Sequence, residues 1–244
     1  MQYFISDDRM IEFVVTEDIT KEFGLHNHTG HYVISFIVKG EATLFYNNVS
    51  VVLKKDDTFV VRPYMPHSVK VEADSQILSL CINKDLFSAQ SANEISQTVS
   101  TKFDEISTEN GFEGRIKSEL TDAIGLITET IGDERYKLSA DIQKVADKIA
   151  EKSSEIYSLN QLSEDVYTSK YHLIKKFKSN VGLTPHQFMI QVRVRNAQKE
   201  LALGGRLIDA AIDNGFYDSS HFDKCFEKIV GISPSEYLKK SRGI

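Results

Sequence analysis

Residues 207–238, LIDAAIDNGFYDSSHFDKCFEKIVGISPSEYL, decide the fold of this chain. We expect a short helix from Leu207 to Asn214, a turn at Gly215, and a second helix whose free N-terminal amides the Asp218 side chain can cap. Apolar residues of the second helix recur at i, i+3, i+4 and i+7, which makes one inward-facing stripe: Phe222, Cys225, Phe226 and Ile229. The stretch therefore predicts a helix-turn-helix.

The second helix of this motif turns a polar face outward. Its outward residues are Ser219, Ser220, Asp223 and Lys224. The major groove of duplex DNA accepts a helix with such a face. Paired helices that only pack give the same pattern, so this stretch alone leaves open both DNA binding and a helical protein-interaction module.

An internal repeat favours DNA binding. A shift of 49 residues pairs His172 with His221, Lys175 with Lys224, Phe177 with Phe226, Val181 with Val230, Gly182 with Gly231 and Pro185 with Pro234. Upstream of the turn the shift falls by one, pairing Ser163 with Ala211, as expected if the two turns differ by one residue. The chain therefore contains two similar helix-turn-helix motifs.

The first motif follows a supporting helix around Ile142–Ile149. Ser158 and Gln161 form a capping box for its first helix, and Ser169 starts its reading helix. The outward residues of this reading helix are Tyr171, Ile174, Lys175 and Lys178. An outward isoleucine suits a thymine methyl group, and a lysine suits a guanine edge or a phosphate. A long helix from Pro185 to about Leu203 then joins the two motifs.

The pattern A-x3-G-F-x-D-x2-H-F-x3-F-x4-G-x-S-P-x2-Y in the second motif, together with the tandem arrangement, resembles AraC-type transcription regulators over residues 138–240. The resemblance implies sequence-specific binding of double-stranded DNA, and RNA polymerase as a further partner. It implies these base or backbone readers: Tyr171, Ile174, Lys175, Ser219, Ser220 and Lys224. His221 also matches a family position, but we expect it to pack. Tyr167 departs from the pattern, because it occupies a turn position that often holds glycine.

The charge is divided between the two halves of the chain. Residues 138–244 hold 16 Lys and Arg against 13 Asp and Glu, a net +3, and the remainder has a net −9. The acidic half repels phosphate, which fits a sensor domain beside a modestly basic DNA reader.

The sequence gives no sign of a membrane or secretory segment. Its apolar runs are shorter than the roughly 20 residues that cross a bilayer, and MQYFISDDRM lacks the regions of a signal peptide. We therefore expect a cytoplasmic protein. The two cysteines, Cys81 and Cys225, are expected to act as small apolar residues rather than as a disulfide.

The N-terminal third predicts antiparallel β-structure. Short β-rich runs are separated by turn residues, namely YVISFIV, EATLFY, VSVVL, TFVVRP, HSVKV and QILSLCI, with breaks at Lys39-Gly40, Asn47-Asn48 and Asp56-Asp57. A sandwich or barrel is expected. The order H-x-H, strand, Gly40, hairpin, D-x5-P-x2-P-H is similar to the cupin-like sensor barrel of AraC-type regulators.

Three histidines mark the candidate site in the barrel. His26 and His28 are two apart, which predicts one face of a strand, and His67 is expected to approach from a later strand. Three imidazoles can hold a divalent metal, although the carboxylate of the full cupin pattern is absent between His28 and Gly40. A metal site, an effector pocket and structural histidines all remain open. We expect a small-molecule effector, without metal or other cofactor.

Residues 84–137 predict helices. Apolar residues recur at spacings of three and four residues, which forms one stripe along a helix: Ile116, Leu120, Ala123, Ile124, Ile127 and Ile131. The stripe either packs on the barrel or forms the seam of a homodimer, and the resemblance favours the seam. The polar run at 132–140 is interpreted as a linker.

The sequence thus predicts an α+β two-domain protein. Residues 1–83 form a cupin-like antiparallel β-barrel that senses an effector, residues 84–137 a helical dimerisation segment and linker, and residues 138–244 an all-α tandem helix-turn-helix domain. The expected function is transcription regulation without catalysis. The alternative is a metal-dependent cupin enzyme that carries a DNA-binding tail.

Overall fold

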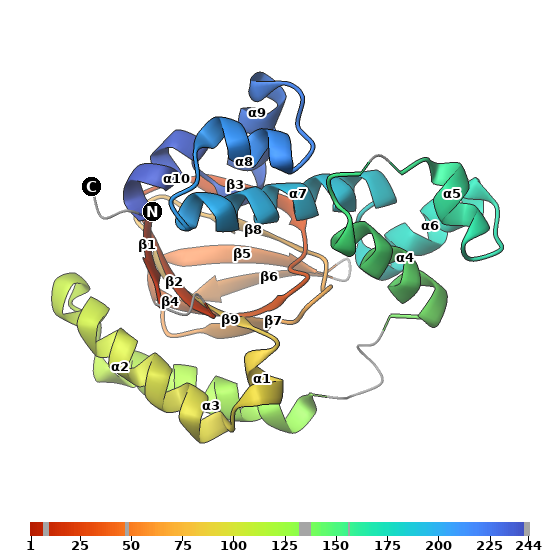
Figure 1. Ribbon diagram of the computed structural model, residues 1–244. Coiled ribbons are helices and arrows are strands. Elements are labelled where there is room, and N and C mark those ends of the chain that lie inside the picture. Colours follow the sequence, from red (N-terminus) through yellow and green to blue (C-terminus); the bar gives the residue numbers. More distant parts are fainter. Residues whose placement is uncertain (7–9, 47–48, 132–137, 156, 242–244) are drawn as a thin grey trace. The chain divides into compact units, whose positions relative to one another are not determined.

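The computed structural model describes residues 1–6, 10–46, 49–131, 138–155 and 157–241 (Figure 1). The chain divides into two compact units. Unit 1 comprises residues 1–22, 28–65 and 69–137, and unit 2 comprises residues 138–244 with two short segments, Phe23–Asn27 and Pro66–Ser68. Residues 132–137 of the expected linker, and the break at Asn47-Asn48, lie outside the described residues. None of the described helices is long and apolar enough to span a bilayer.

Unit 1 is built on antiparallel β-structure. One sheet has the order β1-β2-β9-β4-β7 and the other β3-β8-β5-β6. The strands are β1 (Gln2–Ile5), β2 (Ile11–Glu17), β3 (Lys21–His26), β4 (His31–Lys39), β5 (Glu41–Tyr46), β6 (Val49–Lys54), β7 (Thr58–Val61), β8 (His67–Val71) and β9 (Gln76–Asn83). All six runs quoted from the sequence are strands, which confirms the predicted β fold. The first three strands were not assigned individually.

Strand β4 lies in the middle of the unit 1 core. It pairs with β7 on one side and β9 on the other, and its residues 33–37 are all buried. Ile34 and Phe36 join the core on the helix side of the sheet. A buried run of this length, apolar except for Ser35, is typical of a strand covered on both faces.

Three helices cover the five-stranded sheet: α1 (Leu86–Ala89), α2 (Ala92–Asn110) and α3 (Gly114–Thr130). Helix α2 begins at a capping box, in which Ser91 and Glu94 satisfy each other's backbone amides. Helices α2 and α3 lie side by side (Figure 1). Their buried side chains join those of β2, β4 and β9 in one cluster, so the helices complete the core of unit 1.

The apolar stripe of α3 faces this core. Leu120 is 0% exposed and Ile127 is 1% exposed, and both belong to the cluster that fills the space between helices and sheet. The prediction that this stripe forms a dimer seam is wrong, because side chains that fill the chain's own core cannot meet a second copy. The alternative interpretation, packing on the sheet, is confirmed.

Unit 2 is helical apart from its two short segments. Its helices are α4 (Ala140–Glu151), α5 (Leu159–Glu164), α6 (Lys170–Val181), α7 (Pro185–Ala202), α8 (Leu207–Asp213), α9 (Ser219–Val230) and α10 (Pro234–Ser241). The predicted capping boxes are present at Ser158 before α5 and at Thr184 before α7. Ser233 accepts the amide of Glu236 at the start of α10, as expected.

The turn between α5 and α6 contains a strained residue. Tyr167 has φ +51°, in the left-handed region, and its side chain is 98% exposed. A β-carbon in this region costs roughly 1–2 kcal/mol. The departure seen in the sequence is therefore a real cost, and no burial of the Tyr167 side chain offsets it.

We expect Leu120→Ala to lower the free energy of unfolding of unit 1 by about 2–5 kcal/mol, because a fully buried leucine leaves a cavity. Leu126→Ala is the matched control on the same helix, since Leu126 is 55% exposed. Chemical denaturation followed by circular dichroism measures both. Equal effects of the two substitutions would contradict the burial of the α3 stripe.

We expect Tyr167→Asn to raise the free energy of unfolding by about 1 kcal/mol, because asparagine tolerates the left-handed conformation better than tyrosine. Tyr217→Asn is the control, since Tyr217 is also exposed but lacks a positive φ. Thermal denaturation of both variants tests this. A stabilised Tyr217→Asn, or an unchanged Tyr167→Asn, would count against backbone strain.

Candidate nucleic-acid interface and histidine site

The two helix-turn-helix motifs, α5–α6 and α8–α9, are closed by the same pair of backbone hydrogen bonds. In the first motif, the amides of Tyr167 and Thr168 donate to the carbonyl oxygens of Glu164 and Ser163, respectively. In the second, the amides of Gly215 and Phe216 donate to the carbonyl oxygens of Ile212 and Ala211, respectively. The pairs are offset by 48 residues, as the shift upstream of the turn predicted. The additional residue of the second turn is Tyr217, which is 84% exposed.

The reading helices α6 and α9 begin and end alike. The side chain of Ser169 accepts the amide of His172 at the start of α6, and the side chain of Asp218 accepts the amides of Ser220 and His221 at the start of α9. Each helix ends at a left-handed glycine. The predicted repeat is therefore a repeat of structure.

Each reading helix buries an apolar stripe and exposes the opposite face. Leu173 and Phe177 of α6 are buried, as are Phe222 and Phe226 of α9. Five of the six expected readers are exposed: Tyr171, Lys175, Ser219, Ser220 and Lys224. The sixth, Ile174, was expected to point outward but is half-buried, because it lies beside the stripe. His221 is exposed, yet its ring centroid lies 5.7 Å from that of Phe216, so it also contacts the core.

The lysines of the reading helices differ in their partners. Lys176 of α6 donates to Asp141 of α4 at 2.6 Å, and this hydrogen bond lowers the pKa of the Asp141 carboxyl. Lys175 and Lys224 are exposed, and within the described part of the chain neither forms an ion pair. These two ammonium groups are therefore available to phosphate or to a base edge.

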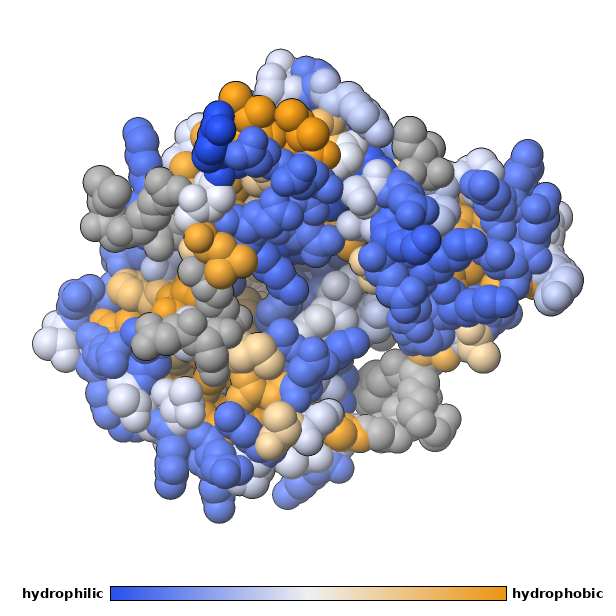
Figure 2. Space-filling view, viewed as in Figure 1, coloured by the Kyte–Doolittle hydropathy of each residue, from blue (hydrophilic) through white to orange (hydrophobic). Residues whose placement is uncertain are grey.

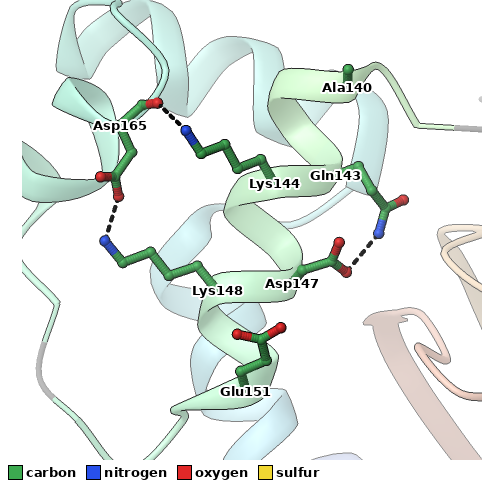
Figure 3. Close-up of a pocket in the computed structure, with 7 residues that line it drawn as sticks. All are labelled: Ala140, Gln143, Lys144, Asp147, Lys148, Glu151 and Asp165. Atoms are coloured by element: carbon green, nitrogen blue, oxygen red, sulfur yellow. Dashed lines mark hydrogen bonds and ion pairs between the residues drawn. The ribbon is translucent and has the colours of Figure 1, made fainter.

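The turn of the first motif is fastened to α4. Figure 3 shows Lys144 donating to the Asp165 carbonyl oxygen at 2.8 Å and Lys148 donating to its carboxylate at 2.5 Å. These residues line a pocket of about 590 Å³. Ligand pockets are mostly apolar, whereas the lysines here already bind Asp165. We assign this pocket to the support of the strained turn at Tyr167.

The surface of α8 has an apolar patch that the sequence pattern alone did not predict. Ile208 and Ile212 lie one turn apart and are 63% and 61% exposed. Figure 2 shows the hydrophobic atoms gathered over this helix. These two isoleucines form an exposed apolar pair on one face of α8.

The structure brings the three expected histidines together. Their nearest nitrogen atoms all lie within 4.8 Å of one another, and the ring centroids of His26 and His67 are 4.3 Å apart. His26 ends β3 and His67 begins β8, but His28 lies in the loop after β3. The expectation that His26 and His28 share one face of a strand is therefore wrong, because the strand ends before His28.

His26 is held neutral. Burial, then the neighbouring His67 and more weakly Arg195, lower its pKa to about 3, against the opposing effect of a hydrogen bond to Gly24. Its Nδ1 donates to the Gly24 carbonyl oxygen at 2.7 Å, so Nε2 carries the lone pair. Within the described residues the cluster contains no carboxylate. The neutral His26 imidazole, together with the imidazoles of His28 and His67, suits a divalent transition metal or the polar groups of a small ligand.

Asn27, next to His26, was not recognised in the sequence. It is 0% exposed, and its side-chain Nδ2 donates to the Val181 carbonyl oxygen at the end of α6, at 2.8 Å. Gln191 of α7 donates to Asn27 Oδ1 at 2.7 Å and accepts the Asn27 amide at 3.2 Å. These three bonds, which we call the Asn27 network, connect the residue after His26 to the end of a reading helix.

Pro66, next to His67, contacts the same helix end. Gly182, which follows Val181, has φ +77°, and a β-carbon there would lie 2.2 Å from Pro66 Cβ. Only glycine fits both the left-handed conformation and this approach. Each histidine-bearing segment of unit 2 therefore contacts the C-terminus of α6 through the residue beside its histidine.

Comparison with known proteins agrees with this arrangement. A cupin domain family matches residues 13–83, and a helix-turn-helix domain family matches residues 162–240. The uncharacterized HTH-type transcriptional regulator YbfI of Bacillus subtilis is 30% identical over 245 residues, covering 86% of this chain and 85% of that protein. An uncharacterized HTH-type transcriptional regulator of Staphylococcus aureus is 26% identical over 230 residues, covering 84% of this chain but 31% of that longer protein.

The fold matches a solved structure over nearly its whole length. The crystal structure of ToxT from Vibrio cholerae superposes with a TM-score of 0.63 at 16% sequence identity, covering 96% of this chain and 99% of that one. The relatives are transcriptional regulators and not enzymes, so the alternative of a cupin enzyme with a DNA-binding tail is wrong. The chain belongs to the AraC family of helix-turn-helix transcriptional regulators and carries an N-terminal cupin domain.

Proposed function

We propose that this regulator reads two successive major-groove faces of its operator with α6 and α9. The observation that carries the proposal is the equivalence of Lys175 and Lys224, each exposed and each two positions after a buried anchor, Leu173 or Phe222. A lysine retained only for solubility has no reason to occupy the same place in two helices. Its ammonium group contacts a phosphate or a guanine edge.

The other proposed readers have distinct chemistry. Ser219 and Ser220 lie in the first turn of α9, where N-terminal residues of a reading helix meet base edges. Tyr171 is 78% exposed in the first turn of α6 and can reach a phosphate through its hydroxyl. Ile174 is half-buried, so only part of its side chain remains for a thymine methyl group.

We also propose that a small-molecule effector binds beside His26, His28 and His67 and controls DNA binding. The Asn27 network and the Pro66–Gly182 contact support this, because a ligand that moves either histidine segment also moves a group at the end of α6. The ligand needs differential affinity for two arrangements of this network to shift their populations.

Further partners complete the proposed role. The protein acts as a homodimer in the cytoplasm, through a surface other than the buried stripe of α3. RNA polymerase is the proposed protein partner, and the exposed Ile208 and Ile212 of α8 offer it an apolar contact.

Selection of bound duplexes from a random DNA pool tests the central proposal that α6 and α9 read DNA, because two spaced half-elements should be recovered. Recovery of no motif would reject it.

We expect both Lys175→Ala and Lys224→Ala to weaken binding to the selected duplex, with Lys224→Ala costing at least as much, since the second turn carries no strained tyrosine. If the lysine contacts a phosphate, its removal weakens binding to all sequences and reduces the salt slope by about one. If it contacts a guanine, its removal costs roughly 1–3 kcal/mol at the cognate site only. Titrations at two salt concentrations distinguish these, with Lys55→Ala as the exposed control from unit 1. Unchanged affinity and slope in both variants would remove these lysines from the interface.

We expect His67→Ala to alter reporter expression in cells that supply the effector more than it alters the DNA affinity of the purified protein, because His67 is on no reading helix. His186→Ala, at an exposed histidine of α7, is the matched control. A normal reporter response of His67→Ala would contradict the effector site. Stoichiometric metal in the purified protein, with unfolding on chelation, would instead identify a structural metal site.

A further inference from the structure

One buried arginine connects the two helix-turn-helix motifs. Arg193 of α7 is 6% exposed, and its guanidinium donates three hydrogen bonds to backbone carbonyl oxygens. The acceptors are Ser153 (Nε, 2.6 Å), Gly215 (Nη1, 2.9 Å) and Glu155 (Nη2, 3.1 Å). All three donor nitrogens of the guanidinium are used.

The three carbonyls belong to two different parts of unit 2. Ser153 and Glu155 lie in the segment that leads from α4 into α5, the first helix of the first motif. Gly215 lies in the turn of the second motif, between α8 and α9. A single planar group therefore fixes the approach to one motif and the turn of the other relative to α7.

The two segments also touch each other at this place. Gly215 has φ +76°, and a β-carbon there would lie 2.9 Å from the Ser154 carbonyl oxygen and 3.0 Å from Arg193 Cζ. Asn196 lies about one turn after Arg193 on α7, and it donates to Ser153 Oγ at 2.9 Å. It therefore binds only the segment between α4 and α5. The junction has no room for even one additional carbon atom.

The chemistry of this contact favours positioning over simple stability. Burial lowers the Arg193 pKa, because the charged form loses its water. Within the described residues its guanidinium forms no ion pair with a carboxylate that would compensate. An apolar side chain would fill the same space without this desolvation cost. What only the guanidinium supplies is three directed bonds in one plane.

We propose that Arg193 sets the distance and rotation between α6 and α9, and thereby selects the separation of the two half-elements in the operator. The inference rests on the proposed reading of DNA by both helices. One base pair changes the separation of two elements by about 3.4 Å and roughly one-tenth of a turn. A fixed pair of reading helices rejects such a change, whereas a loosened pair tolerates it.

The test uses the full-length protein and the duplex obtained by selection, together with duplexes that contain one more or one fewer base pair between the half-elements. The wild type is expected to bind the altered duplexes on the order of tenfold or more weakly, since one helix loses its base contacts. Arg193→Met is expected to bind all three duplexes with similar affinity. Arg193→Lys is not expected to restore the preference, because one ammonium group cannot reach three separated carbonyls.

Two further variants control for damage to the fold. Asn196→Ala loses a bond to the first segment only and is expected to keep the wild-type spacing preference. Gly215→Ala disturbs the same junction while retaining Arg193, and it is expected to lose the preference, which provides a second test if Arg193→Met does not fold. Folding is checked by circular dichroism at the temperature of the titrations.

The outcomes separate the inference from the proposed function. A wild type that binds no selected duplex rejects DNA reading by the two helices. A wild type that discriminates spacing, with an unchanged preference in folded Arg193→Met or Gly215→Ala, overturns the role of Arg193 alone. A flattened spacing preference in these variants, and not in Asn196→Ala, supports it.

Discussion

The arrangement of unit 2 depends on the burial of helix α7. Both helix-turn-helix motifs pack against it, and α4 and α10 do so as well. Phe188, Val194, Ala197 and Leu201 are fully buried along its length. Burial of large apolar side chains is the dominant favourable contribution to such packing. Each motif is too small to bury its own stripe alone, so α7 supplies the surface that both motifs share.

Polar groups buried on the same helix add direction to this apolar packing. Gln191 takes part in the Asn27 network, and Arg193 binds carbonyls in the approach to the first motif and in the turn of the second. A buried polar group without a partner is costly, so these side chains tolerate few alternative arrangements. Helix α7 thus carries the apolar contacts that stabilise the two motifs and the hydrogen bonds that orient them.

Much of the local structure follows from short-range rules that a sequence displays. The caps at Ser158, Ser169 and Asp218 were predicted because a side-chain oxygen satisfies amides two or three residues later. The repeat predicted the equivalent turns, including the difference of one residue. Tyr167 was recognised as a departure, and its positive φ shows that hydrogen bonding of the turn outweighs the preference of tyrosine.

The sequence by itself determined the two helix-turn-helix motifs, the β-structure and the family, because periodicity, capping and motif spacing act within a few residues. Tertiary structure decided the rest. The stripe on α3 has the same spacing whether it meets a sheet or a second chain, and only the sheet's apolar face decided that Leu120 is buried within the chain. Asn27 and Arg193 look like ordinary polar residues in the sequence. Their roles arise from partners distant along the chain, Gln191 for one and Gly215 for the other, which only folding brings within hydrogen-bond distance.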